Sequence, residues 1–180
     1  MTTPYKKRRL GALSATFCIW AIFFGCIGCQ DKGVQVVERE ASAGILRLLD
    51  WDPKAEEMIQ LVGEWSYVPY ELIDSFPTSS ENQYIYLPDT WGESTIKQSF
   101  EEGQGCASLR LVLEGLPQIK LALAIKQINS AYQLLLNGEL VHQNGQVTCD
   151  PSDATPDYTY QPYVFDNRGD QLEIILQISN

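Results

Sequence analysis

Short apolar segments separated by turn residues dominate the sequence from residue 44 onward. Hydrophobic and polar residues alternate over Leu61–Tyr67, and the strands expected at Cys106–Leu113 and Leu172–Ile178 follow the same period of two. This period is typical of a strand with one buried face. Leu121–Ile125 and Tyr132–Leu136 are nearly continuous apolar runs, which predicts central strands that are covered on both faces.

The segments between these runs predict further strands and the turns that connect them. Further strands are predicted over Gly44–Asp50, Tyr84–Leu87 and Glu139–Gln143. Asn137-Gly138 is the strongest two-residue hairpin signal in the chain. We expect one helical turn over Glu71–Phe76 and a long loop over Thr148–Tyr163. Roughly eight or nine short strands with hardly any helix predict an all-β fold, an antiparallel β-sandwich.

A basic and then apolar leader precedes this domain. Lys6, Lys7, Arg8 and Arg9 stand before an uncharged stretch from Leu10 to Gly28, and this order is that of an export signal. The apolar stretch of 19 residues is long for a cleavable signal and just long enough to span a bilayer. We therefore assign residues 1–29 to a signal peptide or membrane anchor.

Two interpretations of the leader remain open beside ordinary cleavage. Cys26-Ile27-Gly28-Cys29 resembles the end of a lipoprotein signal, in which Cys29 receives the lipid, although Cys26 stands where Leu is usual. The alternative is an uncleaved signal anchor. Both predict an extracytoplasmic domain, in the periplasm or on the cell surface, that stays tethered to a membrane. The polar residues 30–43 would form the tether and residues 44–180 the folded domain.

The charge of the exported part excludes one class of partner. The four basic residues of the leader leave nine Lys and Arg against 23 Asp and Glu from Cys29 onward, a net charge of −14. Such a surface repels phosphate backbones, so we expect no nucleic acid partner.

Two cysteines lie in the folded part, Cys106 and Cys149. In an oxidising compartment two such thiols favour a disulfide. The alternative is a pair of unlinked small hydrophobic residues. Two Cys and the single His142 do not make a zinc site, so no metal and no cofactor are expected.

Several motifs along the chain resemble a known type of extracellular domain. They are the segments 44–52, Gly63-Glu64-Trp65, Leu87-Pro88-Asp89-Thr90-Trp91, 103–111, 130–138 and 172–180. Together they resemble the sensor domain of bacterial seven-transmembrane receptors with diverse intracellular signalling modules. The same skeleton is similar to the sugar-binding domain of β-galactosidase-type glycosidases.

The resemblance implies a galactose-binding-like jelly roll outside the cell. It also implies seven-helix membrane and cytosolic signalling modules as partners. Two departures stand out: Leu109 occupies a position where such sequences often carry Tyr, and relatives continue beyond Asn180 into a last strand and the membrane helices. We expect the domain to lack that last strand, and the chain to be either a receptor fragment or a free-standing domain.

No arrangement of residues typical of an enzyme is visible. The sequence contains no nucleophile elbow, phosphate-binding loop or His-Glu-x-x-His motif. We interpret His142 as a surface or edge residue and Glu101-Glu102 as a solvated turn. Asp150, Asp153 and Asp157 fit no strict calcium loop. The protein is therefore predicted not to be an enzyme.

Binding of a carbohydrate or other small molecule is the remaining chemistry. A sugar site needs an aromatic face for the C–H side of the ring and fixed polar groups for its hydroxyls. Trp91 is the first aromatic candidate, with packing in the fold as the alternative, and Arg110, Asn129 and Tyr132 are the polar candidates. The aromatic residues of the long loop are second candidates: Tyr158, Tyr160 and Tyr163. We interpret Trp51 and Trp65 as core residues.

These observations predict an extracytoplasmic ligand-sensing domain of a bacterial membrane receptor. The alternative is a free-standing surface or periplasmic lipoprotein that binds glycans or a protein partner.

Overall fold

A computed structural model describes residues 36–55, 58–76, 83–88, 104–125, 128–157 and 161–180 of the chain. The chain divides into two units, Met1–Lys32 and Gly33–Asn180, and all described residues belong to the second. No helix that could cross a membrane occurs among the described residues. Cys29 and the leader lie outside them.

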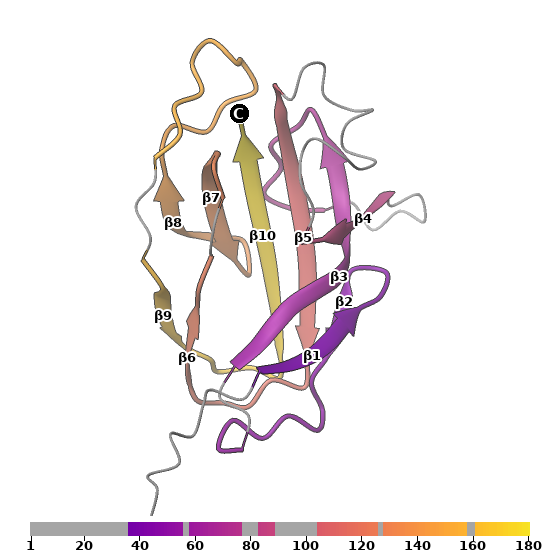
Figure 1. Ribbon diagram of the computed structural model, residues 1–180. Coiled ribbons are helices and arrows are strands. Elements are labelled where there is room, and N and C mark those ends of the chain that lie inside the picture. The colour runs from indigo at the N-terminus through magenta and orange to yellow at the C-terminus, as the bar shows by residue number, and fades with distance from the viewer. Residues whose placement is uncertain (1–35, 56–57, 77–82, 89–103, 126–127, 158–160) are drawn as a thin grey trace, which may run out of the picture. The chain divides into compact units, whose positions relative to one another are not determined.

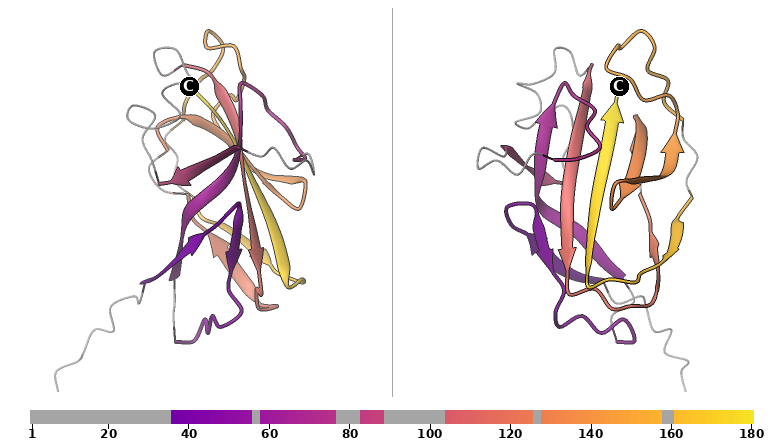
Figure 2. Two further views of the ribbon diagram at one scale, coloured as in Figure 1. Left: turned by 90° about the vertical axis from the view of Figure 1, so that its right-hand side faces the viewer. Right: turned by 180° about the vertical axis from the view of Figure 1, so that it is seen from behind.

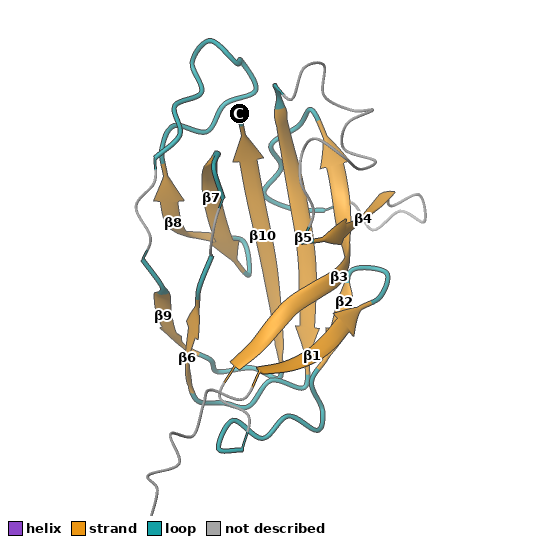
Figure 3. Ribbon diagram, in the orientation of Figure 1, coloured by secondary structure: helices purple, strands orange, loops and turns teal. Residues whose placement is uncertain are grey.

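The described part of the second unit consists of strands and irregular segments, without any helix (Figure 3). The strands are β1 (Val36–Ala41), β2 (Ile45–Arg47), β3 (Met58–Pro69), β4 (Gln83–Leu87), β5 (Cys106–Glu114), β6 (Lys120–Leu123), β7 (Ala131–Leu136), β8 (Glu139–Asn144), β9 (Tyr163–Asp166) and β10 (Gln171–Ser179). The prediction of an all-β sandwich is confirmed.

Two sheets make up the sandwich (Figure 1). The large sheet has the order β1-β3-β5-β10-β7-β8, with β2 also paired to β5 and β4 to β3, and the small sheet is β6-β9. The prediction of a purely antiparallel fold needs one correction. The pairs β1–β3 and β2–β5 are parallel. In each pair the two strands are joined by a crossover connection instead of a hairpin.

The central strand β10 shows how the sequence pattern builds the core. It is antiparallel to β5 and to β7, and its register runs from Gln171 opposite Glu114 to Ser179 opposite Cys106. Alternation places one set of apolar residues on the inner face, namely Leu172, Ile174, Leu176 and Ile178. These pack with the leucines of β5 and β7 and with the small sheet. We call the opposite side of the large sheet its outer face.

Residues 70–76 lie along the outer face of β5 and β10. The Ser108 hydroxyl accepts a hydrogen bond from the Ile73 amide and donates one to the Glu71 carbonyl, both at 2.9 Å. Gln177 on β10 donates to Asp74. The prediction of a helical turn over Glu71–Phe76 is wrong, because these backbone groups bond to strand side chains instead of to one another.

The predicted tether also needs a correction. Residues 36–41 of the expected 30–43 tether form β1, which pairs with β3 from Val36 opposite Met58 to Ala41 opposite Gly63. Backbone pairing with β3 therefore draws the second half of this polar stretch into the sheet. The strand expected over Gly44–Asp50 is shorter, Ile45–Arg47.

The structure joins Cys106 and Cys149 in a disulfide with a Cα–Cα distance of 4.8 Å. Cys106 begins β5, and Cys149 lies in the long loop that follows β8. A second attachment of this loop is the hydrogen bond from the Thr148 amide to the Ser179 hydroxyl at 3.2 Å. The loop is thus fixed to the ends of two central strands.

Candidate binding cleft

An open cleft of about 310 Å³ lies between the β7–β8 hairpin and the segment that contains β9 and the turn into β10. Its walls combine apolar, aromatic and polar side chains. They include Leu136, Asn137, Glu139, Val141, Tyr163, Phe165, Asp166, Asn167, Arg168, Gln171 and Leu172. Mixed lining of this kind is typical of small-molecule sites, in which apolar surface supplies affinity and a few polar groups fix orientation.

Two aromatic rings form one wall of the cleft. Tyr163 and Phe165 alternate along β9, and their rings stack with centroids 6.0 Å apart and an interplanar angle of 15°. Both side chains are half-buried against the core, whereas Val164 between them is exposed. The opposing strand holds them in place, with Leu121 opposite Phe165 on β6. The result is a fixed aromatic surface at the open side of the sandwich.

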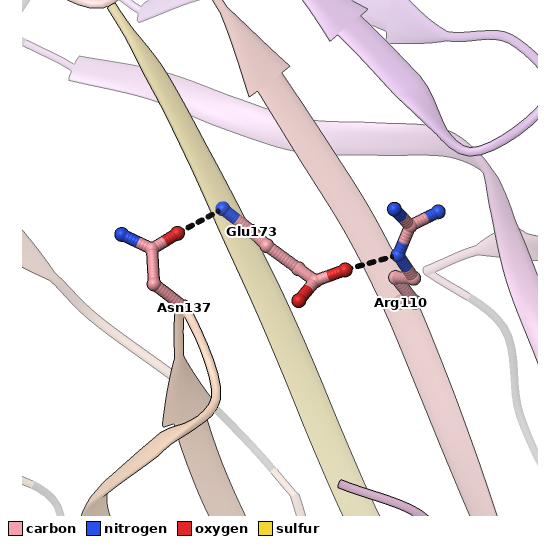
Figure 4. A network of polar contacts seen from close by, with 3 residues as sticks. All are labelled: Arg110, Asn137 and Glu173. Atoms are coloured by element: carbon pink, nitrogen blue, oxygen red, sulfur yellow. Dashed lines mark hydrogen bonds and ion pairs between the residues drawn. The ribbon is translucent and has the colours of Figure 1, made fainter. Parts of the chain in front are cut away.

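Asn137 holds the tip of the hairpin on β10. It adopts a left-handed backbone conformation with φ +49°, which Asn tolerates well. Its backbone N–H donates to the Glu173 carbonyl at 2.9 Å. Its side-chain Oδ1 accepts from the Glu173 backbone N–H, also at 2.9 Å (Figure 4). Because both bonds reach one residue of a central strand, the turn that forms this side of the cleft is held at two points.

Asn167 fixes the opposite side of the cleft. Its buried side-chain amide donates to the carbonyls of Pro117 at 2.9 Å and Gly169 at 2.7 Å. The neighbouring Arg168 is exposed, as is Glu139 across the cleft. Among the described residues, neither side chain has an ion-pair partner. A guanidinium and a carboxylate are therefore available to hydroxyl groups at the rim.

Of the four predicted ligand residues, the structure describes Arg110, Asn129 and Tyr132, and it does not bring these three together. Trp91 lies outside the described residues. Asn129 is exposed just before β7. Arg110 points to the outer face of β5, where its Nε donates to Glu173 and its guanidinium lies 5.9 Å from the centre of the Phe76 ring.

The predicted ligand residue Tyr132 lines neither hollow of the structure. Tyr132 lies on the inner face of β7, is 3% exposed and belongs to the core. Burial raises the pKa of its phenol above the usual value. Its ring lies 5.7 Å from that of His142. The alternation of β7 turns this residue of an apolar run towards the core.

The predictions that Trp51 and Trp65 are core residues and that His142 is an edge residue agree with the structure. Trp65 is buried in the core and Trp51 packs against it. His142 lies on β8, the edge strand of the large sheet. Tyr158 and Tyr160 lie outside the described residues, but Tyr163 is part of the cleft. The cleft is not predicted from the sequence, because the expected loop over Thr148–Tyr163 extends into β9 and no strand is expected over residues 164–166.

The acidic loop after β8 is organised by its own side chains. Asp150 accepts hydrogen bonds from the amide and the hydroxyl of Ser152, which lower the pKa of its carboxyl. No group of three or more potential metal ligands occurs among the described residues.

Comparison with known proteins gives likenesses of fold. The sequence matches no protein-family model and no curated protein. A β-glucuronidase from Faecalibacterium prausnitzii has 14% identity over 66% of this chain, with a TM-score of 0.48. A GH2 β-galacturonidase from Eisenbergiella tayi, solved with galacturonate bound, has 18% identity over 65% of it and a TM-score of 0.43. This chain spans 20% and 18% of the length of those two enzymes, respectively.

Proposed function

We propose that this chain is an extracytoplasmic, membrane-tethered module that binds a carbohydrate without transforming it. The observation that carries the proposal is the stacked pair Tyr163 and Phe165 in a cleft whose rim offers Asn137, Glu139 and Arg168. The C–H face of a sugar ring packs on an aromatic surface, and its hydroxyls need fixed donors and acceptors at the edge. The cleft supplies both.

The proposal that the module is not an enzyme rests on the composition of the cleft. Glycoside hydrolysis by the usual route needs two carboxyl groups on opposite sides of the bond, one of which is held protonated. Glu139 and Asp166 are the acidic residues that line the cleft. Both are exposed at the rim of the open cleft, so neither is enclosed in the kind of apolar surroundings that such an acid needs.

The proposed location rests on the leader and the disulfide. The basic and apolar leader is that of an exported protein. A Cys106–Cys149 bond is chemically suited to an oxidising compartment, outside the cytoplasm. Within such a compartment the sensor domain of a membrane receptor is the leading interpretation, on the strength of the sequence resemblance. A free-standing lipoprotein is the second, favoured by the lipobox-like Cys29.

The binding claim is tested with Tyr163→Ala. The full chain, solubilised in detergent, is titrated with a panel of neutral mono- and disaccharides by calorimetry. Loss of the ring removes one wall of the cleft, and we expect the affinity for any sugar that binds to fall at least tenfold, about 1.4 kcal/mol. Tyr84→Ala is the matched control, because Tyr84 is an exposed strand tyrosine that does not line the cleft. Equal affinity of both variants would contradict the proposal.

The proposed lipid tether is tested at Cys29. Cells that produce the chain are grown with a fatty-acid analogue, and labelling of the wild type is compared with Cys29→Ala and Cys26→Ala. We expect Cys29→Ala to abolish labelling and Cys26→Ala to retain it, because the lipid is attached through the Cys29 thiol. Labelling that persists in Cys29→Ala would rule out this attachment, and absence of label in the wild type would favour the uncleaved anchor.

A further inference from the structure

A second hollow of about 240 Å³ lies on the outer face of the large sheet. It is lined by Arg110, Val112, Asn137, Gln171 and Glu173. Asn137 and Gln171 also line the cleft described above. Asn137 follows the end of β7, and Gln171 is the first residue of β10. The two hollows therefore adjoin each other at one end of the sheet and share part of their walls.

Arg110 is held in a fixed orientation in this hollow. Its Nε donates to the Glu173 carboxylate, and the Phe76 ring lies on its guanidinium. Figure 4 shows the two terminal nitrogens directed away from that carboxylate. Among the described residues, these nitrogens make no hydrogen bond or ion pair. Both side chains of the pair are partly exposed, at 28% and 29%.

A guanidinium beside a carboxylate matches neighbouring hydroxyl groups. The terminal nitrogens of Arg110 can donate to hydroxyl oxygens, and the Glu173 carboxylate can accept from hydroxyl hydrogens. Asn137 and Gln171 at the shared boundary add amide groups of both kinds. The hollow has little apolar surface besides Val112. It is therefore suited to a hydroxyl-rich ring that approaches edge-on.

The charges in the second hollow favour a neutral ligand. The positive charge of Arg110 is already balanced by Glu173. The surrounding exported part carries a net charge of −14, which repels anions. A sugar acid or a phosphate would find no unpaired cation in this hollow. The negative charge of the domain would also repel it.

We propose that the two hollows are two subsites of one binding surface, and that the ligand is a neutral oligosaccharide of two or more rings. This inference rests on the proposed carbohydrate-binding function. The hollows have volumes of about 310 and 240 Å³. The smallest ordinary small-molecule pockets have volumes of about 300 Å³, so each hollow has room for about one ring. One ring packs on Tyr163 and Phe165 in the cleft. The next ring lies beyond Asn137 and Gln171 and is bound through its hydroxyls by Arg110 and Glu173.

The test is a series of ligand lengths with the full chain in detergent. Cello-, xylo- and galacto-oligosaccharides of one to four rings are titrated by calorimetry, together with di- and trigalacturonate as acidic probes. Two subsites predict that, in the series that binds, two rings bind at least tenfold tighter than one. The gain should be small beyond the second or third ring. The acidic probes should bind more weakly than the neutral chain of equal length.

The variant for this test removes both members of the ion pair, Arg110→Gln with Glu173→Gln. Replacing both partners leaves neither Arg110 nor Glu173 as a charge without its partner. We expect the double variant to bind a single ring as the wild type does and to lose the tenfold gain for two rings. Unchanged single-ring affinity also reports that the domain is folded. The matched control is Arg47→Gln with Glu114→Gln, which removes another Arg–Glu pair outside both hollows.

The outcomes separate this inference from the proposed function. If single rings bind in the cleft but longer chains gain nothing, or if the Arg110 and Glu173 variant keeps the gain, the second subsite is refuted and the cleft stands. If galacturonate chains bind tighter than neutral ones, the neutral ligand class is refuted. If no sugar of any length binds, the proposed function fails, and the two-subsite inference fails with it.

Discussion

At the scale of single residues, Gly63 decides how closely β1 approaches β3. Its φ of +112° lies in a region that side chains rarely adopt. A Cβ at this position would overlap the backbone nitrogen and oxygen of Ala41 on β1. Gly138 in the β7–β8 turn also has a positive φ, +81°, but a Cβ there would meet nothing within 4 Å. Substitutions at the two glycines therefore distinguish the cost of a positive φ from the cost of steric overlap.

We therefore expect Gly63→Ala to destabilise the domain more than Gly138→Ala. Both variants incur the cost of a left-handed residue, about 1–2 kcal/mol. Gly63→Ala incurs in addition about 1–3 kcal/mol for overlap with a strand that must move. Urea unfolding of the two variants with the disulfide intact measures the difference. Equal losses would mean that β1 does not pack on β3 at this point.

The residue types alone could not identify which face each side chain occupies. Arg110 and Tyr132 were both predicted as ligand residues, and the structure places them on opposite faces: Arg110 lines the second hollow, whereas Tyr132 lies in the core. A nearly continuous apolar run carries no period, so nothing in residues 131–136 marks Tyr132 as an inward position. Trp65 could be placed in the core because its strand alternates clearly. Tyr163 was predicted only as a second candidate, because it stands at the end of the stretch expected to be a loop.

At the scale of elements, strands marked by alternation or by an apolar run were predicted, and two strands formed by pairing were not. The predicted strands at 106–113, 132–136, 139–143 and 172–178 correspond to β5, β7, β8 and β10. β1 and β9 have a different origin. Each is a short segment that becomes a strand because another strand offers it a partner, β3 for β1 and β6 for β9. Such pairing is not visible in local sequence.

The candidate site depends on these unpredicted elements. β9 carries the aromatic wall of the cleft, and the turn between β9 and β10 carries Arg168. The predicted Asn137-Gly138 hairpin supplies the facing wall. One side of the cleft was therefore visible in the sequence and the other was not. Residues 70–76 cross the outer face of the large sheet (Figure 2), where the centre of the Phe76 ring lies 5.9 Å from the Arg110 guanidinium.

At the scale of the whole molecule, both proposed binding hollows lie on one β-sandwich. The inner faces of its sheets form a core of leucine, isoleucine and aromatic side chains. The outer face of the large sheet is covered in part by residues 70–76 and by the disulfide-linked loop. The open side between β8 and β9 keeps a cleft, and the adjacent end of the sheet keeps a second hollow. A rigid frame of this kind suits binding by preformed surfaces.

The most direct test of the account locates a bound sugar on the folded chain. Methyl groups of Leu, Val and Ile are labelled, and their resonances are followed while the tightest-binding neutral disaccharide of the panel is added. The account predicts shifts at Leu136, Val141 and Leu172, which line the cleft, and none at Leu46 and Leu48, which are buried elsewhere in the core. Saturable binding that shifts other methyl groups and leaves those three unchanged would contradict the central claim.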